Sequence, residues 1–540
     1  MGKFVMLKEK PLQGRRQHRR LFVQIACILA LVWICYRTLV GLGGSSGSSH
    51  GNRAAEDHHL TESLSRIVKL LPDETQSYKL LKPVGTTGEE RLKEFGLRTR
   101  QYKELFEAWE TLHIGDAPGN GFIRDDVIQR IQRNPQIASS LSMGHAELIQ
   151  YYESYRSTIT RLATLLFPWT APYFSDHLQL RQQLSQGGRG LVFTAGNSHA
   201  PYLLTSIPVL RQLGCHLPIE VMYLGDDDLQ QKYRTQLEAH AGVVTRDLRR
   251  MVNDAGWELR GWAGKPFSVL LSSFREVIFI DADSLFLQNP ADLFDDPAYN
   301  ETGALFFKDR LILPESKKDW LTRILPPPIS KNVRESRLWS GESGHMQESG
   351  VLVIDTWRHF VPLLLVTRMN GPDRDGDSAR KIKGVYEMLF GDKETFWLGW
   401  ELSGVTDYAF HDGGAGTMGV AQTEPSVSKG NAYPSSQSDS FTVCAPQLLH
   451  LDRTGRPLWF NGWLLPNKFS SKEPGKFESF IREEEGYMND DSPWQLRTSN
   501  VCCLTSNKVF DFSEKEKHVL EMTIESGRRV GALGEKSTSS

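Results

Sequence analysis

Short apolar segments alternate with helical ones from residue 190 onward, and this alternation is the strongest constraint on the fold. The strand-like segments are 191–194, 219–224, 243–245 and 277–280, and the helical segments between them are 200–213, 230–241 and 265–274. Strands that alternate with helices form a mostly parallel sheet with helices on both faces. The sequence therefore predicts an α/β fold for this part of the chain.

Two aspartates follow the last of these strands directly. Asp281 and Asp283 form a D-x-D motif after the strand 277–280, and another apolar run follows at 284–287. Ligands of open α/β sheets bind at the carboxyl ends of the strands. Two carboxylates there suit Mg²⁺ or Mn²⁺, which keep phosphate oxygens among their other ligands. We therefore expect a metal-bridged diphosphate substrate, such as a sugar nucleotide.

Other pairs in the chain share the D-x-D spacing, so the context must separate them. Two overlapping pairs lie in the loop 370–377, whose glycine stands at the wrong position for a calcium-binding loop. Asp226 and Asp228 follow a strand-like segment and are real competitors, although they could instead cap a helix. The pair Asp281/Asp283 has apolar runs on both sides, and buried carboxylates need a metal or a cationic partner.

The loop after the first strand is a candidate donor-binding segment. Its small residues, which include Thr194, Gly196 and Asn197, would let a nucleotide approach the backbone. The N-terminus of the helix that follows favours phosphate. A plain tight turn explains the same residues equally well.

The N-terminus has the pattern of a membrane anchor. Lysine and arginine dominate residues 1–20, and residues 21–42 are mostly apolar, with Gln24 and Arg37 as polar interruptions. This length crosses a bilayer, and basic residues before the span place the N-terminus in the cytoplasm. We therefore expect a single-pass type II membrane protein whose bulk is luminal. A cleaved secretory signal is the alternative.

Composition and organisation are those of a globular protein behind a tether. With 39% hydrophobic residues, 24% charged residues and a net charge of −2, the chain gives no support for a nucleic-acid partner. We expect a cytoplasmic tail at 1–20, a signal anchor at 21–42, a luminal linker and helical stem at 43–185, a catalytic domain at 186–512 and a helical or disordered tail at 513–540. An oxidising lumen permits one or two disulfides among Cys215, Cys444, Cys502 and Cys503.

Six short segments give the chain a specific resemblance. They are 194–197, 217–221, 279–283, 347–350, 391–394 and 459–462. In this order they resemble the fungal Golgi α-mannosyltransferases that extend N-linked and O-linked glycans, the α-1,3-mannosyltransferase group (glycosyltransferase family 71-like) with its α-1,2 relatives. The resemblance implies a GT-A fold with one Rossmann-like nucleotide-sugar-binding domain, a GDP-mannose donor, a mannose-containing glycan acceptor, Mn²⁺ (or Mg²⁺) and retention of anomeric configuration. It also implies a location in the Golgi membrane with a luminal catalytic domain.

The resemblance suggests roles for four residues of the donor site. Asp281 and Asp283 would hold the metal, or Asp281 would reach the ribose while Asp283 binds the metal directly. His450 is a candidate third metal ligand, although a core histidine would show the same pattern. Lys265 could pair with a donor phosphate, or it could be an ordinary solvated lysine.

Candidate catalytic groups cluster in two segments. Glu348 or Ser349 could bond mannose hydroxyls, and Gly350 would let the backbone approach the sugar. By resemblance to retaining GT-A enzymes, Asp392 lies near the anomeric carbon or the acceptor hydroxyl, as a nucleophile or as a group that steadies an oxocarbenium-like centre. A helix N-cap is its structural alternative. Glu394 is a second catalytic candidate.

Four tryptophans, Trp397, Trp400, Trp459 and Trp463, could stack on sugar rings or pack in the core. Two other protein classes are alternatives to a transferase. A haloacid-dehalogenase-type phosphatase also places D-x-D after a strand, but on the first strand of its domain. A luminal lectin would bind sugar without needing the two aspartates. The motifs do not distinguish α-1,3 from α-1,2 transfer, and we expect the loops 311–339 and 411–443 to contact the acceptor.

Overall fold

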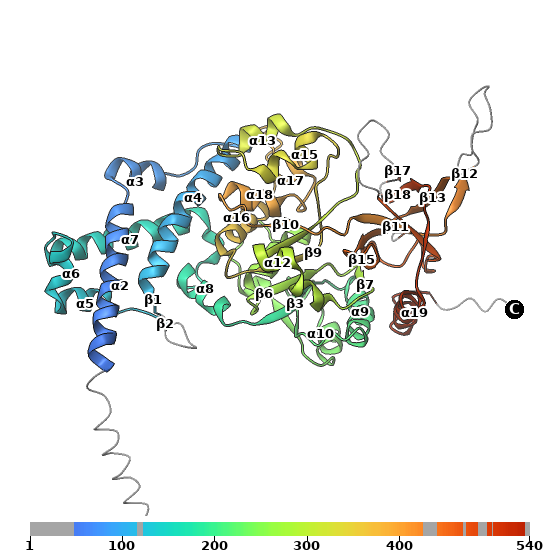
Figure 1. The fold of residues 1–540 in the computed structure, drawn as a ribbon, viewed down its shortest axis with the longest axis horizontal. Coiled ribbons are helices and arrows are strands. Elements are labelled where there is room, and N and C mark those ends of the chain that lie inside the picture. Colours follow the sequence, from blue (N-terminus) through green and yellow to red (C-terminus); the bar gives the residue numbers. More distant parts are fainter. Residues whose placement is uncertain are drawn as a thin grey trace, which may run out of the picture. The chain divides into compact units, whose positions relative to one another are not determined.

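The computed structural model describes residues 48–115, 122–424, 440–467, 471–483, 494–498 and 500–534 (Figure 1). They fall into two compact units. The first comprises residues up to 69 together with 126–152, and the second comprises 70–125 and the chain from 153 onward. The first unit contains most of helix α2 (Ser48–Leu70) together with α5 (Val127–Arg133) and α6 (Pro135–Ser140). An ion pair of 2.7 Å between Arg130 and Glu56 links α5 to α2.

The second unit begins with a helical part that supports the sheet. Its longest helix, α4 (Gly88–His113), packs against α16 (Phe360–Asn370) and α18 (Thr395–Leu402). Every residue of α16 is buried, because other elements surround it on all sides. The helical periodicity of the predicted stem is therefore found in the structure, but α4 packs directly on helices that lie within residues 186–512.

A seven-stranded sheet forms the centre of the second unit. Its strands, in spatial order, are β10 (Ala409–Phe410), β8 (Ala304–Lys308), β9 (Gln347–Asp355), β6 (Glu276–Ile280), β3 (Arg189–Thr194), β4 (Ile219–Tyr223) and β5 (Val243–Asp247). Strands β6, β3, β4 and β5 are parallel, whereas β9 is antiparallel to both of its neighbours. The predicted α/β class with a mostly parallel sheet is confirmed, and β9 makes the sheet mixed.

Helices cover the sheet because its strands are apolar on both faces. Alternate residues of β3 and β6, such as Phe193 and Ile280, share one hydrophobic cluster with Leu203 and Ile207 of α9 (Ala200–Gln212). On the same two strands packs α11 (Gly264–Leu271), which itself contacts α16. This two-sided burial explains the continuous apolar run of β6.

A second sheet, which the sequence did not predict, begins directly after the D-x-D motif. It is antiparallel, and its strands in spatial order are β19 (Phe510–Asp511), β16 (Ser479–Arg482), β11 (Ala415–Gly419), β14 (Leu448–Leu451), β15 (Pro457–Asn461) and β7 (Ser284–Phe286). Ser284 of β7 pairs with Asn461 of β15. The motif is therefore the turn at which the chain passes from the central sheet into the second one.

A third, four-stranded sheet carries the disulfide. Its order is β12 (Gln422–Glu424), β13 (Ser440–Ala445), β18 (Val501–Ser506) and β17 (Trp494–Thr498). Cys444 of β13 is bonded to Cys503 of β18, while Cys215 and Cys502 are free and buried. The pairing, which the sequence left open, follows from the register of these two strands.

Two of the sequence predictions concern the ends of the chain. The predicted anchor at 21–42 lies outside the described residues. Within the described ranges, no helix combines the length and the apolar character that a bilayer crossing requires. The tail 513–540 contains α19 (Glu514–Arg529), which packs against α9.

Candidate active site

Two hollows meet at the turn that carries the D-x-D motif. The smaller, of about 240 Å³, lies at the carboxyl ends of β3 and β4. The larger, of about 460 Å³, is lined by residues of both sheets, including Glu348 of β9 and Asn461 of β15. The residues that line both hollows are Trp262, Lys265, Asp281 and Asp283. The predicted ligand edge of the sheet is therefore a real cavity, as expected for strand ends in an α/β fold.

Backbone hydrogen bonds hold the D-x-D turn from two sides. The N–H of Asp281 donates to the carbonyl oxygen of Gly350 at 2.8 Å, which ties the turn to β9. The N–H of Trp463 donates to the carbonyl oxygen of Asp283 at 3.0 Å, which ties it to the segment after β15. The turn is thus fixed by both sheets, and the two carboxylates project from a rigid support.

Lys265 of α11 lies at the centre of the first buried charge network. Its Nζ lies 2.7 Å from Oδ2 of Asp281, 3.2 Å from Oδ2 of Asp392 and 3.1 Å from Oγ of Ser349. Ser349 also donates a hydrogen bond of 2.9 Å to Asp392. Burial lowers the pKa of Lys265, but the carboxylates of Asp281 and Asp392 outweigh burial and hold that pKa above its ordinary value. The lysine is therefore charged, buried and paired, and not solvated.

A second network contains two residues that sequence reasoning missed. Nζ of Lys393 lies 2.8 Å from Oδ2 of Asp309 and 2.6 Å from Oε2 of Glu348. The other oxygen of Glu348 accepts hydrogen bonds of 2.9 Å from the Gly350 N–H and the Asn461 amide. Burial raises the pKa of Glu348, but the Lys393 ammonium group outweighs burial and holds that pKa below its ordinary value, so this carboxyl is ionised. Lys393 was visible in the segment 391–394, whereas no local motif marks Asp309.

Glu394, a predicted catalytic candidate, is placed differently from Asp392. Its carboxylate accepts hydrogen bonds from the backbone N–H groups of Met346 and Gln347 at 2.7 and 3.2 Å and from the indole of Trp397 at 2.5 Å. Burial raises its pKa to about 7. It lines neither hollow. These contacts anchor the start of β9, and Asp392 is the carboxylate of this segment that faces the larger hollow.

His450, the predicted third metal ligand, lies in the core. It is 1% exposed, and its ring stacks on Trp459 with 4.1 Å between the ring centres. Burial lowers its pKa to about 3, so the imidazole is neutral, but it lines neither hollow. Within the described part of the chain, no group of three or more His, Cys, Asp and Glu side chains is arranged to hold a metal ion.

The predicted donor loop divides between the cavity and the framework. Thr194 and Gly196 line the smaller hollow. A Cβ atom on Gly196 would lie 2.5 Å from Oδ1 of Asp228, so a larger residue there would displace the Asp228 carboxylate. The side chain of Asn197 instead donates to the Asp227 carbonyl at 2.8 Å and accepts from the Gln230 N–H at 2.9 Å, and so braces the loop.

The helix-capping alternative for Asp226 and Asp228 is wrong. Helix α10 (Gln231–Glu238) begins after Gln230, so neither aspartate stands at its N-cap. Asp228 accepts a hydrogen bond of 2.9 Å from the Leu224 N–H and lines the smaller hollow. Asp226 is paired with Arg234 at the surface.

The tryptophans named as sugar-stacking candidates are unsuitable, because all four are at most 1% exposed. The indole N–H groups of Trp397 and Trp400 donate to Glu394 and His359. The ring of Trp459 stacks on His450, and that of Trp463 stacks on Tyr202. The tryptophan that reaches the site is Trp262, which is 66% exposed and lines both hollows. Its glycine-flanked position, 261–264, was the available sequence signal.

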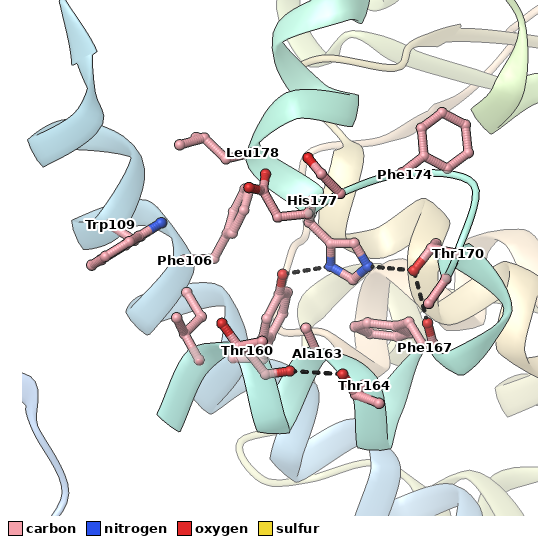
Figure 2. Close-up of a pocket in the computed structure, with 15 residues that line it drawn as sticks. Phe106, Trp109, Thr160, Ala163, Thr164, Phe167, Thr170, Phe174, His177 and Leu178 are labelled. Carbon is pink, nitrogen blue, oxygen red and sulfur yellow. Dashed lines mark hydrogen bonds between the residues drawn. The ribbon is translucent and has the colours of Figure 1, made fainter. Parts of the chain in front are cut away.

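A third cavity, of about 90 Å³, lies among the helices of the second unit (Figure 2). Its aromatic lining includes Phe106 and Phe167. Nδ1 of His177 lies 2.6 Å from the Tyr102 hydroxyl, and its Nε2 lies 3.0 Å from the Thr170 hydroxyl. Figure 2 shows this chain of hydrogen bonds inside the helical layer. Since both ring nitrogens are occupied and burial lowers the His177 pKa to about 4, we interpret this histidine as structural.

Comparison with known proteins gives one family and several relatives. Residues 188–452 match the family described as "Mannosyltransferase putative". The Candida albicans protein named "Putative alpha-1,3-mannosyltransferase MNN14" is 26% identical over 339 residues, which cover 58% of this chain and 47% of that protein. The α-1,3-mannosyltransferase MNT3 of Saccharomyces cerevisiae is 26% identical over 330 residues, which cover 55% of this chain and 49% of the relative. The chain thus spans about half the length of these relatives.

Solved structures resemble the chain only partially. The mannosyltransferase Ktr4p from S. cerevisiae is 10% identical with a TM-score of 0.28, over 45% of this chain and 70% of that one. The galactosyltransferase LgtC, solved with donor and acceptor sugar analogues, is 14% identical with a TM-score of 0.25, over 41% of this chain and 73% of that one. At these scores, the description of the fold rests on the sheet topology itself.

Proposed function

Because residues 188–452 belong to the mannosyltransferase family, we propose that this chain is a hexosyltransferase that transfers mannose from GDP-mannose to a mannose residue of an N- or O-linked glycan. The predicted family resemblance is confirmed by the fungal α-1,3-mannosyltransferases that the chain matches. Their names support α-1,3 linkage, and α-1,2 transfer is the alternative within the family; retention of configuration follows from the family resemblance. The observation that carries the proposal is the D-x-D turn at the meeting point of two hollows.

The two hollows suit the two parts of a sugar nucleotide reaction. The smaller one, at the ends of β3 and β4, has the position in which α/β sheets bind nucleotides. The larger one brings buried carboxylates and lysines together, which suits the hydroxyl-rich sugars. Asp281 and Asp283 stand between them, where a diphosphate would join nucleoside and mannose.

A divalent cation, Mn²⁺ or Mg²⁺, fits these residues. Such ions are commonly held by one or two carboxylates together with substrate phosphates. Burial raises the pKa of Asp281 to about 7 against the effect of Lys265, and the carboxylates of Asp283 and Asp392 add to the rise; a bound cation would lower this pKa again and favour the carboxylate. Asp283 would be the main ligand, because Asp281 already pairs with Lys265. When bound, the ion supplies Lewis-acid neutralisation of the leaving diphosphate.

The chain's own groups then orient the sugar and stabilise developing charge. Lys265 and Ser349 hold Asp392 in one orientation in the larger hollow. An ionised Asp392 beside the anomeric carbon would steady the oxocarbenium-like centre, or attack it as a nucleophile. Glu348, fixed by Lys393 and Asn461, would accept hydrogen bonds from mannose hydroxyls.

The structure disfavours the phosphatase alternative. Strand β6, which delivers the motif, follows β3, β4 and β5 along the chain and is therefore the fourth strand of the central sheet. A haloacid-dehalogenase-type phosphatase would carry its nucleophilic aspartate after the first strand.

The cellular setting belongs to the same proposal. The basic residues 1–20 and the apolar residues 21–42 support a type II anchor with the catalytic region in the Golgi lumen. The disulfide Cys444–Cys503 suits that oxidising compartment.

One experiment tests donor, cation and linkage together. The full-length chain is incubated with several sugar nucleotides and α-mannobiose, with Mn²⁺ or with a chelator, and the product linkage is determined by NMR. We expect GDP-mannose to yield a product with an added α-1,3-linked mannose when Mn²⁺ is present, and no product when the chelator is present. Full activity in chelator, or no transfer from any GDP-sugar, would overturn the proposal.

A further inference from the structure

Two large aromatic side chains stand exposed at the rim of the larger hollow. Trp262 is 66% exposed and Phe390 is 64% exposed, and both line the hollow. The residue after Phe390 lies beside the indole of Trp262, because a Cβ atom on Gly391 would lie 3.8 Å from Cε3 of Trp262. Exposed apolar rings beside a polar cavity are typical of a binding surface.

The backbone at Phe390 has a strained conformation. Phe390 follows helix α17 (Val385–Leu389) and has a φ of 54°, in the left-handed region. A bulky residue rarely adopts this conformation, and such residues cluster at ligand-binding sites. The ring is not buried in return, since its neighbours are the His345 ring at 5.8 Å and the Lys317 ammonium at 5.7 Å.

The floor of the same hollow is polar. Asp309, Glu348 and Lys393 form the second charge network there, and Asn461 binds Glu348 from the neighbouring sheet. A hexopyranose has matching surfaces, because its ring presents an apolar C–H face and an edge of hydroxyls. Flat aromatic rings pack on the first, and charged or amide groups bond the second.

We propose that Trp262 and Phe390 form the platform on which the terminal hexopyranose of the acceptor glycan stacks, with its hydroxyls toward the Asp309–Lys393–Glu348 network. This inference rests on the proposed transferase function. The position of Phe390 indicates that the stacked sugar belongs to the acceptor and not to the donor, because Phe390 lines the larger hollow and not the smaller one at the nucleotide-binding edge. The acceptor is therefore recognised by stacking. Trp262 lies outside the segments that carry the family resemblance, and Phe390 directly precedes one of them, 391–394.

The test compares Trp262→Ala and Phe390→Ala with Tyr78→Ala, a control that removes a 74% exposed aromatic ring from α3 (Glu74–Leu81). Acceptor KM, kcat and the dissociation constant for GDP-mannose with Mn²⁺ are measured for each full-length variant. We expect roughly a ten-fold rise in acceptor KM for each site variant, and for Phe390→Ala, which does not touch the smaller hollow, a kcat and a donor affinity within about two-fold of wild type. Tyr78→Ala should match wild type. Unchanged acceptor KM in both site variants would overturn the platform, as would a ten-fold weaker donor affinity for Phe390→Ala.

Direct sugar binding separates this inference from the transferase proposal. Saturation-transfer NMR of α-mannobiose reports contact with aromatic protons whether or not any transfer occurs. If the wild type is inactive but binds α-mannobiose, and Phe390→Ala loses that signal, the platform stands while the proposed function fails. If the wild type transfers mannose and both variants keep its acceptor KM, the proposed function stands and the platform fails.

Discussion

The ammonium group of Lys265 lies 2.7 Å from Oδ2 of Asp281 and so links helix α11 to the end of β6. The same group lies 3.2 Å from Asp392, which follows Asp281 by more than a hundred residues. One buried lysine therefore joins the D-x-D motif to the carboxylate that we place beside the anomeric carbon. The stability of the fold and the geometry of the site depend on the same contact.

Replacing Lys265 with methionine should destabilise the protein and stop transfer. The change leaves two buried carboxylates without their cation, and breaking a buried pair costs about 3 to 5 kcal/mol. The free energy of unfolding in urea measures this loss. Lys331→Met is the control, since Lys331 is 78% exposed and its pair with Glu335 is worth at most about 1 kcal/mol. Equal losses in the two variants would contradict the role of Lys265.

Replacing Asp283 with asparagine should remove activity and spare the fold. The substitution keeps the size of the side chain but removes the charge that would hold the cation, and we expect transfer to fall by about 10² to 10³-fold. Asp375→Asn is a matched control from another D-x-D pair, because Asp375 is exposed and paired with Arg374. Near-normal transfer by Asp283→Asn, with circular dichroism unchanged, would refute the metal assignment.

The Lys393–Glu348 contact should behave as a coupled pair. A double-mutant cycle with Lys393→Met and Glu348→Gln measures the interaction through the free energy of unfolding, and we expect a coupling of about 1 to 3 kcal/mol because Glu348 is buried and the side chain of Lys393 is mostly covered. The surface pair Lys517 and Glu514, analysed in the same way, should show no measurable coupling, because solvent screens it. Additive effects at the buried pair would mean that the two groups act independently.

Stability should fall as the pH drops from 6.5 to 4. Burial holds the pKa of His177 at about 4, whereas the unfolded histidine has its ordinary value of 6.5, so the unfolded state takes up a proton first. The stability that the neutral ring contributes is full above pH 6.5 and lost toward pH 4, by about 3 kcal/mol. His177→Gln should reduce this loss in chemical denaturation series across that pH range. His58→Gln, which alters a 75% exposed side chain, should leave it unchanged.

Local patterns were sufficient to predict the four parallel strands β3, β4, β5 and β6 of the central sheet. The strand β6 and the amphipathic helices around it were predicted correctly, because a strand that is buried on both faces needs a continuous apolar segment. The position of Asp281 and Asp283 at a ligand edge followed from the same pattern. Boundaries moved by a few residues, as for α11, which begins at Gly264 and ends at Leu271.

The sequence by itself determined the α/β class, the D-x-D edge and the family resemblance, since each depends on neighbours along the chain. Only the tertiary structure decided which polar groups face that edge. Asp309, Lys393 and Glu348 come from different elements and meet through the packing of β8, β9 and the turn before α18. Packing also buried the tryptophans near the motifs and left Trp262 exposed at the rim, because exposure depends on what covers a side chain and not on its own apolar character.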